Sequence, residues 1–144
     1  MSKKIVLVTG GFDPIHSGHI AYFNAAKSLG NFLVVGLNSD SWLTRKKGKS
    51  FMPFQERESV ISNLRMVDLV IQFNDDDGSA IDAIRVVRKM FTTQTIIFAN
   101  GGDRTKSNIP EMSFKDKDLI FEFGVGGEDK KNSSSWILKE WENR

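Results

Sequence analysis

The hydrophobic residues of this chain gather into short, continuous runs separated by more polar segments. Runs of β-branched and other apolar residues are typical of strands that are buried on both faces of a parallel sheet. Five such runs predict strands, at residues 5–8, 32–38, 69–73, 95–100 and 119–124. The last of these strands is expected at an edge of the sheet.

Helical spacing of apolar residues characterises the segments between these runs. In the segment 17–30, Ile20, Phe23 and Ala26 recur at intervals that place them near one side of a helix. Further helices are expected at residues 54–67, 80–90 and 133–144.

The stretch from residue 39 to residue 54 breaks this alternation. It is polar and basic, and Gly48 and Pro53 interrupt it. Because glycine and proline are the strongest local interruptions of regular structure, the stretch predicts a long loop with room for a short helical turn.

Strand and helix otherwise alternate along the chain, with short connections. This order is the signature of a doubly wound, Rossmann-like α/β fold with right-handed crossovers. We therefore expect a parallel sheet of about five strands flanked by helices. The sequence contains no internal repeat and no linker, so residues 1–144 are expected to form a single domain.

The composition excludes several classes of function but does not identify one. The formal net charge of the 144 residues is only +2, which disfavours a nucleic-acid partner. The chain has no cysteine, so disulfides and thiolate metal sites are excluded. The apolar run near the N-terminus is too short to span a membrane or to form a signal sequence. We expect a cytoplasmic protein with no membrane partner.

Ligands of open α/β sheets bind beyond the carboxyl ends of the strands. Polar, small or basic residues follow four of the predicted strands, in the segments 9–19, 38–49, 101–104 and 133–135. Because these loops meet at one edge of the sheet, together they indicate a ligand site more strongly than any one of them does alone.

The first of these loops, TGGFDPIHSGH, carries the only two histidines of the chain. Glycine-rich backbone at a helix N-terminus favours an anion. Zinc normally requires three or four protein ligands, and the chain offers neither cysteine nor a third histidine. Metal binding would need carboxylates and is disfavoured, whereas His16 and His19 suit a polyphosphate. Capping or packing of the helix by one or both histidines is the alternative.

Four motifs, in this order, resemble the nucleotidyltransferase superfamily that includes the cytidylyltransferases. The stretch GGFDPIHSGH is similar to its H-x-G-H signature. Residues 34–73 resemble both glycerol-3-phosphate cytidylyltransferase and the adenylyltransferase domain that activates heptose 1-phosphate. NGGDR resembles the G-D loop of these groups, and NSSSWIL resembles their C-terminal I-S-T-T-type motif.

The resemblance implies that CMP is transferred from CTP to a small phosphorylated sugar or polyol, with release of pyrophosphate. ATP-dependent transfer of AMP to a heptose 1-phosphate-like sugar phosphate is the alternative. Magnesium held by the phosphates, with few or no protein ligands, and a homodimer are also implied. Two rivals are a pantetheine-phosphate or nicotinamide-mononucleotide adenylyltransferase, whose opening motif is similar, and a catalytically silent nucleotide-binding module.

By the same resemblance, His16, His19 and Lys46 would be catalytic and would stabilise negative charge on the α-phosphate in the transition state. The acceptor would contact Asp40, Lys46, Lys47 and Arg57. The nucleotide would contact Thr9, Gly10, Gly11, Phe12, Asp13, His16, Gly18, His19, Gly101, Gly102, Asp103, Ser133, Ser134 and Ser135. For Asp40, capping of a turn is the alternative role.

Two of these assignments have open alternatives. Motif matching aligns Lys46 with the lysine of the cytidylyltransferases and Lys47 with the lysine of the heptose group. Arg57 matches a phosphate-binding arginine, and a surface ion pair with Glu56 or Glu58 is its alternative.

The chain departs from the family pattern near its C-terminus. Glu128, Asp129, Lys130 and Lys131 stand where glycerol-3-phosphate cytidylyltransferases carry Arg-Thr-x-Gly. A lysine does not reproduce the bidentate binding of phosphate by arginine. The departure disfavours glycerol 3-phosphate as the acceptor and weakens the preference for CTP over ATP.

Overall fold

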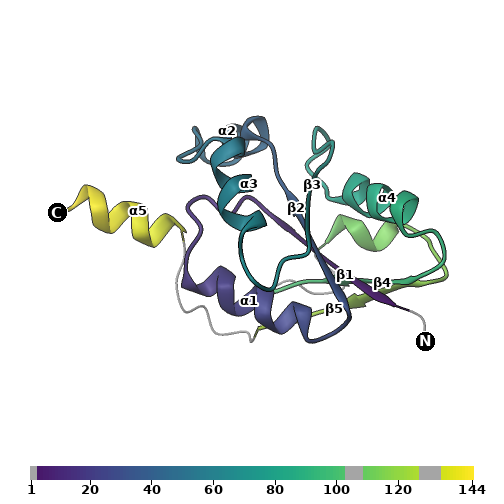
Figure 1. The fold of residues 1–144 in the computed structure, drawn as a ribbon. Helices are drawn as coiled ribbons and strands as arrows, with labels where there is room; N and C mark the ends of the chain where they lie inside the picture. Colours follow the sequence, from purple (N-terminus) through teal and green to yellow (C-terminus); the bar gives the residue numbers. More distant parts are fainter. Residues whose placement is uncertain (1–2, 103–108, 127–133) are drawn as a thin grey trace.

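The computed structural model describes residues 3–102, 109–126 and 134–144, and its strands form one parallel sheet of five strands (Figure 1). The strands are β1 (Lys4–Gly10), β2 (Phe32–Leu37), β3 (Leu69–Gln72), β4 (Thr95–Ala99) and β5 (Leu119–Glu122). Their spatial order is β3-β2-β1-β4-β5. All five predicted strands are confirmed within two residues at each end, and β5 lies at an edge.

Helices cover both faces of the sheet. They are α1 (Ser17–Lys27), α2 (Asp40–Lys47), α3 (Phe54–Ser62), α4 (Ile81–Met90) and α5 (Ser134–Glu142), with a short 3₁₀ helix η1 (Pro110–Ser113). Helices α1 and α3 pack on one face and α4 packs on the other, while α5 extends outward from the sheet (Figure 1). The doubly wound α/β fold expected from the sequence is therefore confirmed.

The central strand β1 shows why its sequence is apolar without alternation. Ile5 and Leu7 belong to the core under α4, whereas Val6 and Val8 belong to the core under α1 and α3. All four side chains are 0% exposed. A strand with helices on both of its faces has no solvated side, so every position favours an apolar residue.

The prediction of a loop was wrong for residues 40–47, which form helix α2. The Ser39 hydroxyl caps this helix by accepting a hydrogen bond from the Trp42 amide at 3.0 Å. Only Leu43 is buried in α2, so the helix carries no apolar periodicity that a sequence pattern could reveal. Gly48, with φ at +94°, ends it.

Helix α3 is also shorter than expected. It ends at Ser62, whereas the apolar spacing predicted a helix over residues 54–67. Val67 is still buried against the same core, because the turns that follow the helix keep its side chain on that face.

The order of the strands locates the ligand side of the sheet. The chain proceeds from β1 through β2 to β3 at one edge and then crosses to β4 and β5 on the other side of β1. The topological switch point therefore lies between β1 and β4, which is where open α/β sheets bind ligands beyond the carboxyl ends of their strands. The loop with both histidines follows β1 at this point.

Candidate active site

His16 and His19 shape the N-terminus of helix α1 through their Nδ1 atoms. His16 is the N-cap residue, and its Nδ1 accepts a hydrogen bond from the Gly18 amide at 3.0 Å. The Nδ1 of His19 accepts a hydrogen bond from the backbone amide of His16 at 3.2 Å. The capping role that the sequence left as an alternative is thus present for both histidines.

These two hydrogen bonds assign the tautomer of both rings. A neutral imidazole accepts with one nitrogen and carries its proton on the other. Since both Nδ1 atoms accept backbone N–H groups, both rings carry their proton on Nε2. The rings stack with centroids 3.7 Å apart and planes inclined by 28°. Capping the helix therefore makes each histidine a donor at Nε2.

His19 remains neutral over the physiological pH range. Burial of the ring is the larger cause, and repulsion from a protonated His16 is the smaller one; together they lower the pKa of His19 from the ordinary 6.5 to about 3. Phe12 contributes to this burial, because its ring packs edge-on against His19 with centroids 4.9 Å apart. A neutral ring at this position suits hydrogen-bond donation rather than proton transfer.

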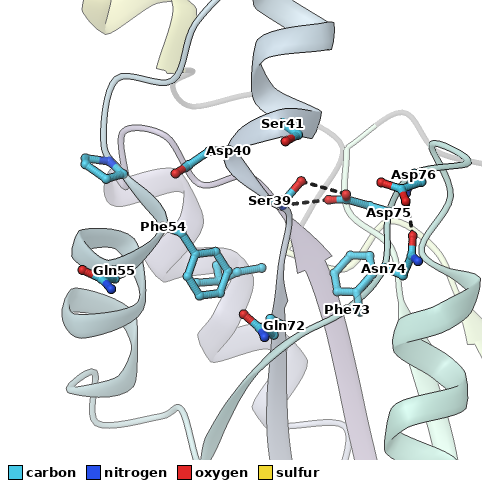
Figure 2. A pocket seen from close by; sticks show the side chains of 12 residues that line it. Ser39, Asp40, Ser41, Phe54, Gln55, Gln72, Phe73, Asn74, Asp75 and Asp76 are labelled. Carbon is cyan, nitrogen blue, oxygen red and sulfur yellow. Dashed lines mark hydrogen bonds between the residues drawn. The ribbon is translucent and has the colours of Figure 1, made fainter.

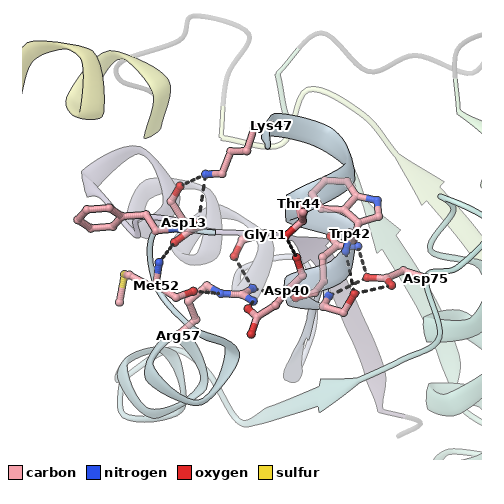
Figure 3. A network of polar contacts seen from close by, with 12 residues as sticks. Gly11, Asp13, Asp40, Trp42, Thr44, Lys47, Met52, Arg57 and Asp75 are labelled. Atoms are coloured by element: carbon pink, nitrogen blue, oxygen red, sulfur yellow. Dashed lines mark hydrogen bonds and ion pairs between the residues drawn. The ribbon is translucent and has the colours of Figure 1, made fainter. Parts of the chain in front are cut away.

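Asp13 is a buried carboxylate that ties the histidine loop to the segment after α2 (Figure 3). It is 2% exposed and accepts hydrogen bonds from the amides of Phe51 at 2.6 Å and Met52 at 2.5 Å. The Nζ of Lys47 lies 3.1 Å from the Asp13 carboxylate and donates to the Asp13 carbonyl at 2.6 Å. Of the residues predicted to bind ligand, Asp13 and Lys47 are therefore paired with each other.

Arg57 is 0% exposed and uses three of its nitrogens on four acceptors. Nη1 donates to the Gly11 carbonyl at 2.9 Å and to the Asn38 carbonyl at 2.8 Å. Nε donates to the Met52 carbonyl at 3.0 Å, and Nη2 donates to Asp40 Oδ1 at 2.7 Å. One guanidinium thus joins the loops that follow β1 and β2 to the segment before α3 (Figure 3).

The ion pair of Arg57 is made with Asp40. The surface pairing with Glu56 or Glu58 that the sequence left open does not fit a guanidinium that is 0% exposed. Asp40 is the first residue of α2 and is half exposed, with 47% of its side chain accessible.

Lys46 and Lys47 project differently from α2. Whereas Lys47 is bound to Asp13, the Nζ of Lys46 lies 4.6 Å from the centroid of the Trp42 ring. This cation–π contact is made on the exposed side of the helix.

The two glycines at the end of β1 permit close packing. A Cβ atom on Gly10 would lie 2.8 Å from the Phe12 ring, and one on Gly11 would lie 2.7 Å from Leu43 of α2. Both distances are too short for a real side chain. From the sequence, we expected these glycines to let a ligand approach the backbone. The structure shows that the Phe12 ring and Leu43 of α2 already lie where their side chains would be.

The remaining predicted residues lie at the ends of β1 and β4 and at the start of α5. Thr9 and Gly10 are the last two residues of β1, and Gly102, with φ at +63°, has open space where a Cβ would be. The Ser134 hydroxyl donates to the Pro14 carbonyl at 2.8 Å, which brings the start of α5 to the histidine loop. Asp103, Ser133 and residues 128–131 lie outside the described residues.

Asp75 is a site residue that sequence reasoning missed. It follows β3, is 2% exposed, and accepts hydrogen bonds from the Asn38 side chain at 3.1 Å and from the Ser39 amide and hydroxyl at 2.7 and 2.8 Å. An acidic run directly after a strand, NDDDGS, was the available signal. Asp75 fixes the entry into α2, which the sequence did not predict as a helix.

A pocket of about 820 Å³ opens beside Asp75, over the carboxyl ends of β2 and β3 (Figure 2). Among the described residues that line it there is no lysine, arginine or histidine. The polar lining consists of hydroxyl, amide and carboxylate groups, and the rings of Phe54 and Phe73 supply apolar surface. The lining residues are Leu37, Ser39, Asp40, Ser41, Pro53, Phe54, Gln55, Gln72, Phe73, Asn74, Asp75 and Asp76.

The part of the chain that the structure describes contains neither a cluster of metal-ligating side chains nor a membrane-spanning helix. No cluster of three or more histidine, cysteine, aspartate or glutamate side chains is arranged to hold a metal ion there. Within the same residues, no helix has the length and apolar character that crossing a membrane requires.

The family model described as "Cytidylyltransferase-like" matches residues 7–114 of this chain. The chain belongs to the cytidylyltransferase-like family. The match begins in β1 and includes the histidine loop, the Arg57 contacts and the pocket beside β3. The prediction of a nucleotidyltransferase is confirmed at the level of this family.

Curated relatives are similar over most of the chain. It is 32% identical over 126 residues to the bifunctional protein HldE of Helicobacter pylori strain G27, which covers 86% of this chain and 26% of that protein. It is 35% identical over 127 residues to HldE of Sulfurimonas denitrificans, covering 86% and 25% respectively. The chain thus spans about a quarter of the length of these relatives.

Solved structures share the fold of this family member. A lipopolysaccharide core biosynthesis protein from Thermoplasma volcanium superposes with a TM-score of 0.63 at 25% identity, covering 84% of this chain and 95% of that one. A putative nicotinate-nucleotide adenylyltransferase from Vibrio parahaemolyticus gives a TM-score of 0.66 at 12% identity, covering 98% and 88%. The second likeness concerns the fold alone.

Proposed function

We propose that this chain transfers AMP from ATP to a sugar phosphate resembling heptose 1-phosphate and releases pyrophosphate. The observation that carries nucleotidyl transfer is the stacked histidine pair at the start of α1, whose Nδ1 atoms are both occupied by backbone amides. The choice of ATP and of a heptose phosphate is supported by similarity to HldE, a heptose-7-phosphate kinase/heptose-1-phosphate adenylyltransferase.

In this proposal the triphosphate lies at the N-terminus of α1, where helix amides and the Nε2–H groups of His16 and His19 face negative charge. An oxygen of the acceptor phosphate attacks the α-phosphorus in line. The bond from the α-phosphorus to the bridging oxygen breaks, and pyrophosphate leaves with the electron pair. Because the attacking oxygen is already anionic, no general base is required. The histidines act by stabilising charge in the transition state.

Lys46 is the lysine that we expect to reach a phosphate. Lys47 is held by Asp13, so its Nζ would have to break a largely buried ion pair to serve a ligand. Lys46 lies on the exposed side of α2, where its Nζ is 4.6 Å from the centroid of the Trp42 ring. We therefore assign the phosphate contact to Lys46 rather than to Lys47.

The pocket over β2 and β3 suits the hydroxylated part of the acceptor. A phosphate would meet three carboxylates there and no lining cation among the described residues. Amide, hydroxyl and carboxylate groups bind sugar hydroxyls instead. The nucleotide would then lie at the switch point between β1 and β4, with the histidine loop between it and the acceptor.

Magnesium enters this proposal as part of the magnesium–nucleotide substrate. Mg²⁺ commonly keeps most of its ligands from phosphates and water, so we expect few or no protein ligands to it. The homodimer that the family resemblance implies also stays a prediction, which sedimentation of the purified protein would measure.

Transfer of CMP from CTP is a second candidate, since the matching family model is cytidylyltransferase-like and Lys46 matches the lysine of that group. The two candidates separate by thermal shift with magnesium and each nucleotide. A ligand that binds only the native state raises the midpoint of unfolding, so ATP is expected to raise it more than CTP.

The decisive experiment follows pyrophosphate release with magnesium, each nucleoside triphosphate and a panel of sugar and polyol phosphates. Release that requires ATP and a sugar 1-phosphate is the expected result. Release with CTP and a polyol phosphate would select the second candidate. No release with any pair would leave the chain as a nucleotide-binding module and overturn the proposed reaction.

A further inference from the structure

We infer that Arg57 is a positioning residue for the transfer reaction, which holds the histidine loop and helix α2 in register rather than contacting a phosphate itself. The inference rests on the proposed function. It departs from the role that motif matching assigns to this arginine, because a ligand-binding guanidinium must present donors to solvent. Arg57 is 0% exposed.

The hydrogen bonds of Arg57 account for most of its donors. A guanidinium has five N–H groups, and four hydrogen bonds with lengths of 2.7 to 3.0 Å are made to protein oxygens. Three of the acceptors are backbone carbonyls, at Gly11, Asn38 and Met52. A hydrogen bond to a backbone carbonyl holds the main chain at that residue, so Arg57 fixes the backbone of three segments at once.

Asp13 completes the connection from the opposite side. Its carboxylate accepts from the amides of Phe51 and Met52, while Arg57 takes the Met52 carbonyl. The segment at Met52 is therefore held by both charges. We name this arrangement the Arg57–Asp13 brace (Figure 3).

The brace holds both ends of the basic helix α2. Its first residue, Asp40, pairs with Arg57 at 2.7 Å, and its last residue, Lys47, pairs with Asp13 at 3.1 Å. Lys46 is carried between these two fixed points, and the loop that leads to His16 is fixed at Gly11 and Asp13. The brace thus sets the position of Lys46 relative to the histidines.

Positioning of this kind has a distinct kinetic signature. A misplacement of about 1 Å costs on the order of a hundredfold in rate, and it acts on the transition state more than on ground-state binding. A guanidinium that contacted a substrate phosphate would show its loss mainly as a raised KM for that substrate.

The test compares Arg57→Lys and Arg57→Gln with Arg88→Lys as a matched control. Arg88 also pairs with a carboxylate, that of Asp116, and also donates to three backbone carbonyls, at Phe91, Gln94 and Asp118. It lies on the α4 side of the sheet, away from the histidine loop. An effect that comes only from lost stability should therefore appear in the Arg57 variants and in Arg88→Lys alike.

Two readouts are needed, because one of them must not depend on turnover. For both Arg57 variants, kcat is expected to fall at least about tenfold while KM for each substrate changes less than about threefold. In the ligand-free protein, ¹⁵N spectra of the two histidine rings are expected to shift in the Arg57 variants and to match the wild type in Arg88→Lys.

Several outcomes overturn the inference. A KM raised about tenfold for one phosphate substrate, with kcat and the ring spectrum retained, would make Arg57 a phosphate ligand. If kcat and the ring spectra changed equally in Arg88→Lys, the effect of the Arg57 variants would be one of general stability. Arg57→Lys keeps the positive charge. If Arg57→Gln does not fold, the test rests on Arg57→Lys. If the wild type releases no pyrophosphate with any pair, the proposed function fails, whereas the ring spectra still decide whether Arg57 holds the loop.

Discussion

His16 and His19 each use one ring nitrogen for the fold, and we propose that the other nitrogen serves a ligand. Their Nδ1 atoms accept the Gly18 and His16 amides, which satisfies donors that the start of α1 would otherwise leave open. The sequence presented capping and phosphate binding as competing roles. The two roles are compatible, because Nδ1 and Nε2 are separate atoms of the ring whose hydrogen bonds point in different directions.

Substitution of His16 by asparagine tests its two roles separately. In His16→Asn the side-chain carbonyl can take the place of Nδ1 and keep the cap, whereas no donor remains at the position of Nε2. We expect turnover to fall about a hundredfold, as for the loss of one transition-state donor, with little change in the urea midpoint.

The control is His16→Ala, which loses both the cap and the donor. It should show the same loss of turnover and an additional loss of about 1 kcal/mol in the free energy of unfolding. Wild-type turnover in His16→Asn would contradict the role of Nε2 as a donor.

The lowered pKa of His19 predicts how stability depends on pH. Burial holds the pKa in the folded protein at about 3, below the ordinary 6.5. As the pH falls below 6.5, the unfolded chain binds a proton that the native ring refuses, so stability decreases by up to about 1.4 kcal/mol per pH unit. Urea midpoints between pH 7 and pH 5 measure this slope, because carboxylates titrate mainly below that range.

His19→Asn is the matched variant for this measurement. It keeps an acceptor for the His16 amide and removes the titrating group. A reduced slope between pH 7 and pH 5 is expected in this variant. An unchanged slope would assign the pH dependence to other groups.

At the scale of elements, the contact between the histidine loop and α2 decides the shape of the site. Sequence periodicity found the strands and the helices α1 and α4 to within three residues, since each of them buries apolar side chains. It missed α2, whose position depends on its Ser39 cap, on Asp75 and on the ion pairs at its two ends. Such polar contacts come from segments distant in the sequence and leave no periodic pattern.

Gly11→Ala tests how closely α2 approaches the loop. The new Cβ would lie 2.7 Å from Leu43 Cδ2, so the buried Leu43 side chain or α2 itself must shift. Overpacking of this kind costs about 1–3 kcal/mol, and chemical denaturation measures the loss. Turnover should also fall, since α2 carries Lys46.

Removal of the obstructing methyl group provides the control. Leu43→Val shortens the side chain opposite Gly11, and the double variant should be more stable than the sum of the two single changes predicts. Strict additivity would show that the clash with Leu43 is not what limits residue 11.

At the scale of the whole molecule, the histidine loop lies between the two regions that we propose to bind the substrates. The switch point between β1 and β4 lies on one side of the histidine loop, and the pocket over β2 and β3 lies on the other. Gly101 and Gly102 follow β4, whereas Gln72, Asn74 and Asp75 end or follow β3. A two-substrate reaction at the loop between them is what this arrangement fits.

Gln72→Ala tests the acceptor side of this division. Gln72 is an exposed amide of the pocket wall, and loss of one hydrogen bond to a neutral hydroxyl costs about 0.5–1.5 kcal/mol. We expect KM for the sugar phosphate to rise about threefold to tenfold, with the Kd for the nucleotide unchanged. Steady-state kinetics and calorimetry measure the two quantities.

Gln94→Ala, outside the pocket, is the control and should leave both quantities at their wild-type values. A changed Kd for the nucleotide in Gln72→Ala would instead assign the pocket to the nucleotide.

The sequence by itself determined the parallel α/β fold, the family and the place of the histidine loop. Apolar runs and the H-x-G-H motif are local patterns, and local patterns can be read in one dimension. The tertiary structure alone decided that Asp13 and Lys47 pair, that Arg57 is buried against three backbone carbonyls, and that Asp75 fixes the start of α2. The physical reason is that the role of a charged side chain depends on which distant groups surround it, and folding is what brings those groups together.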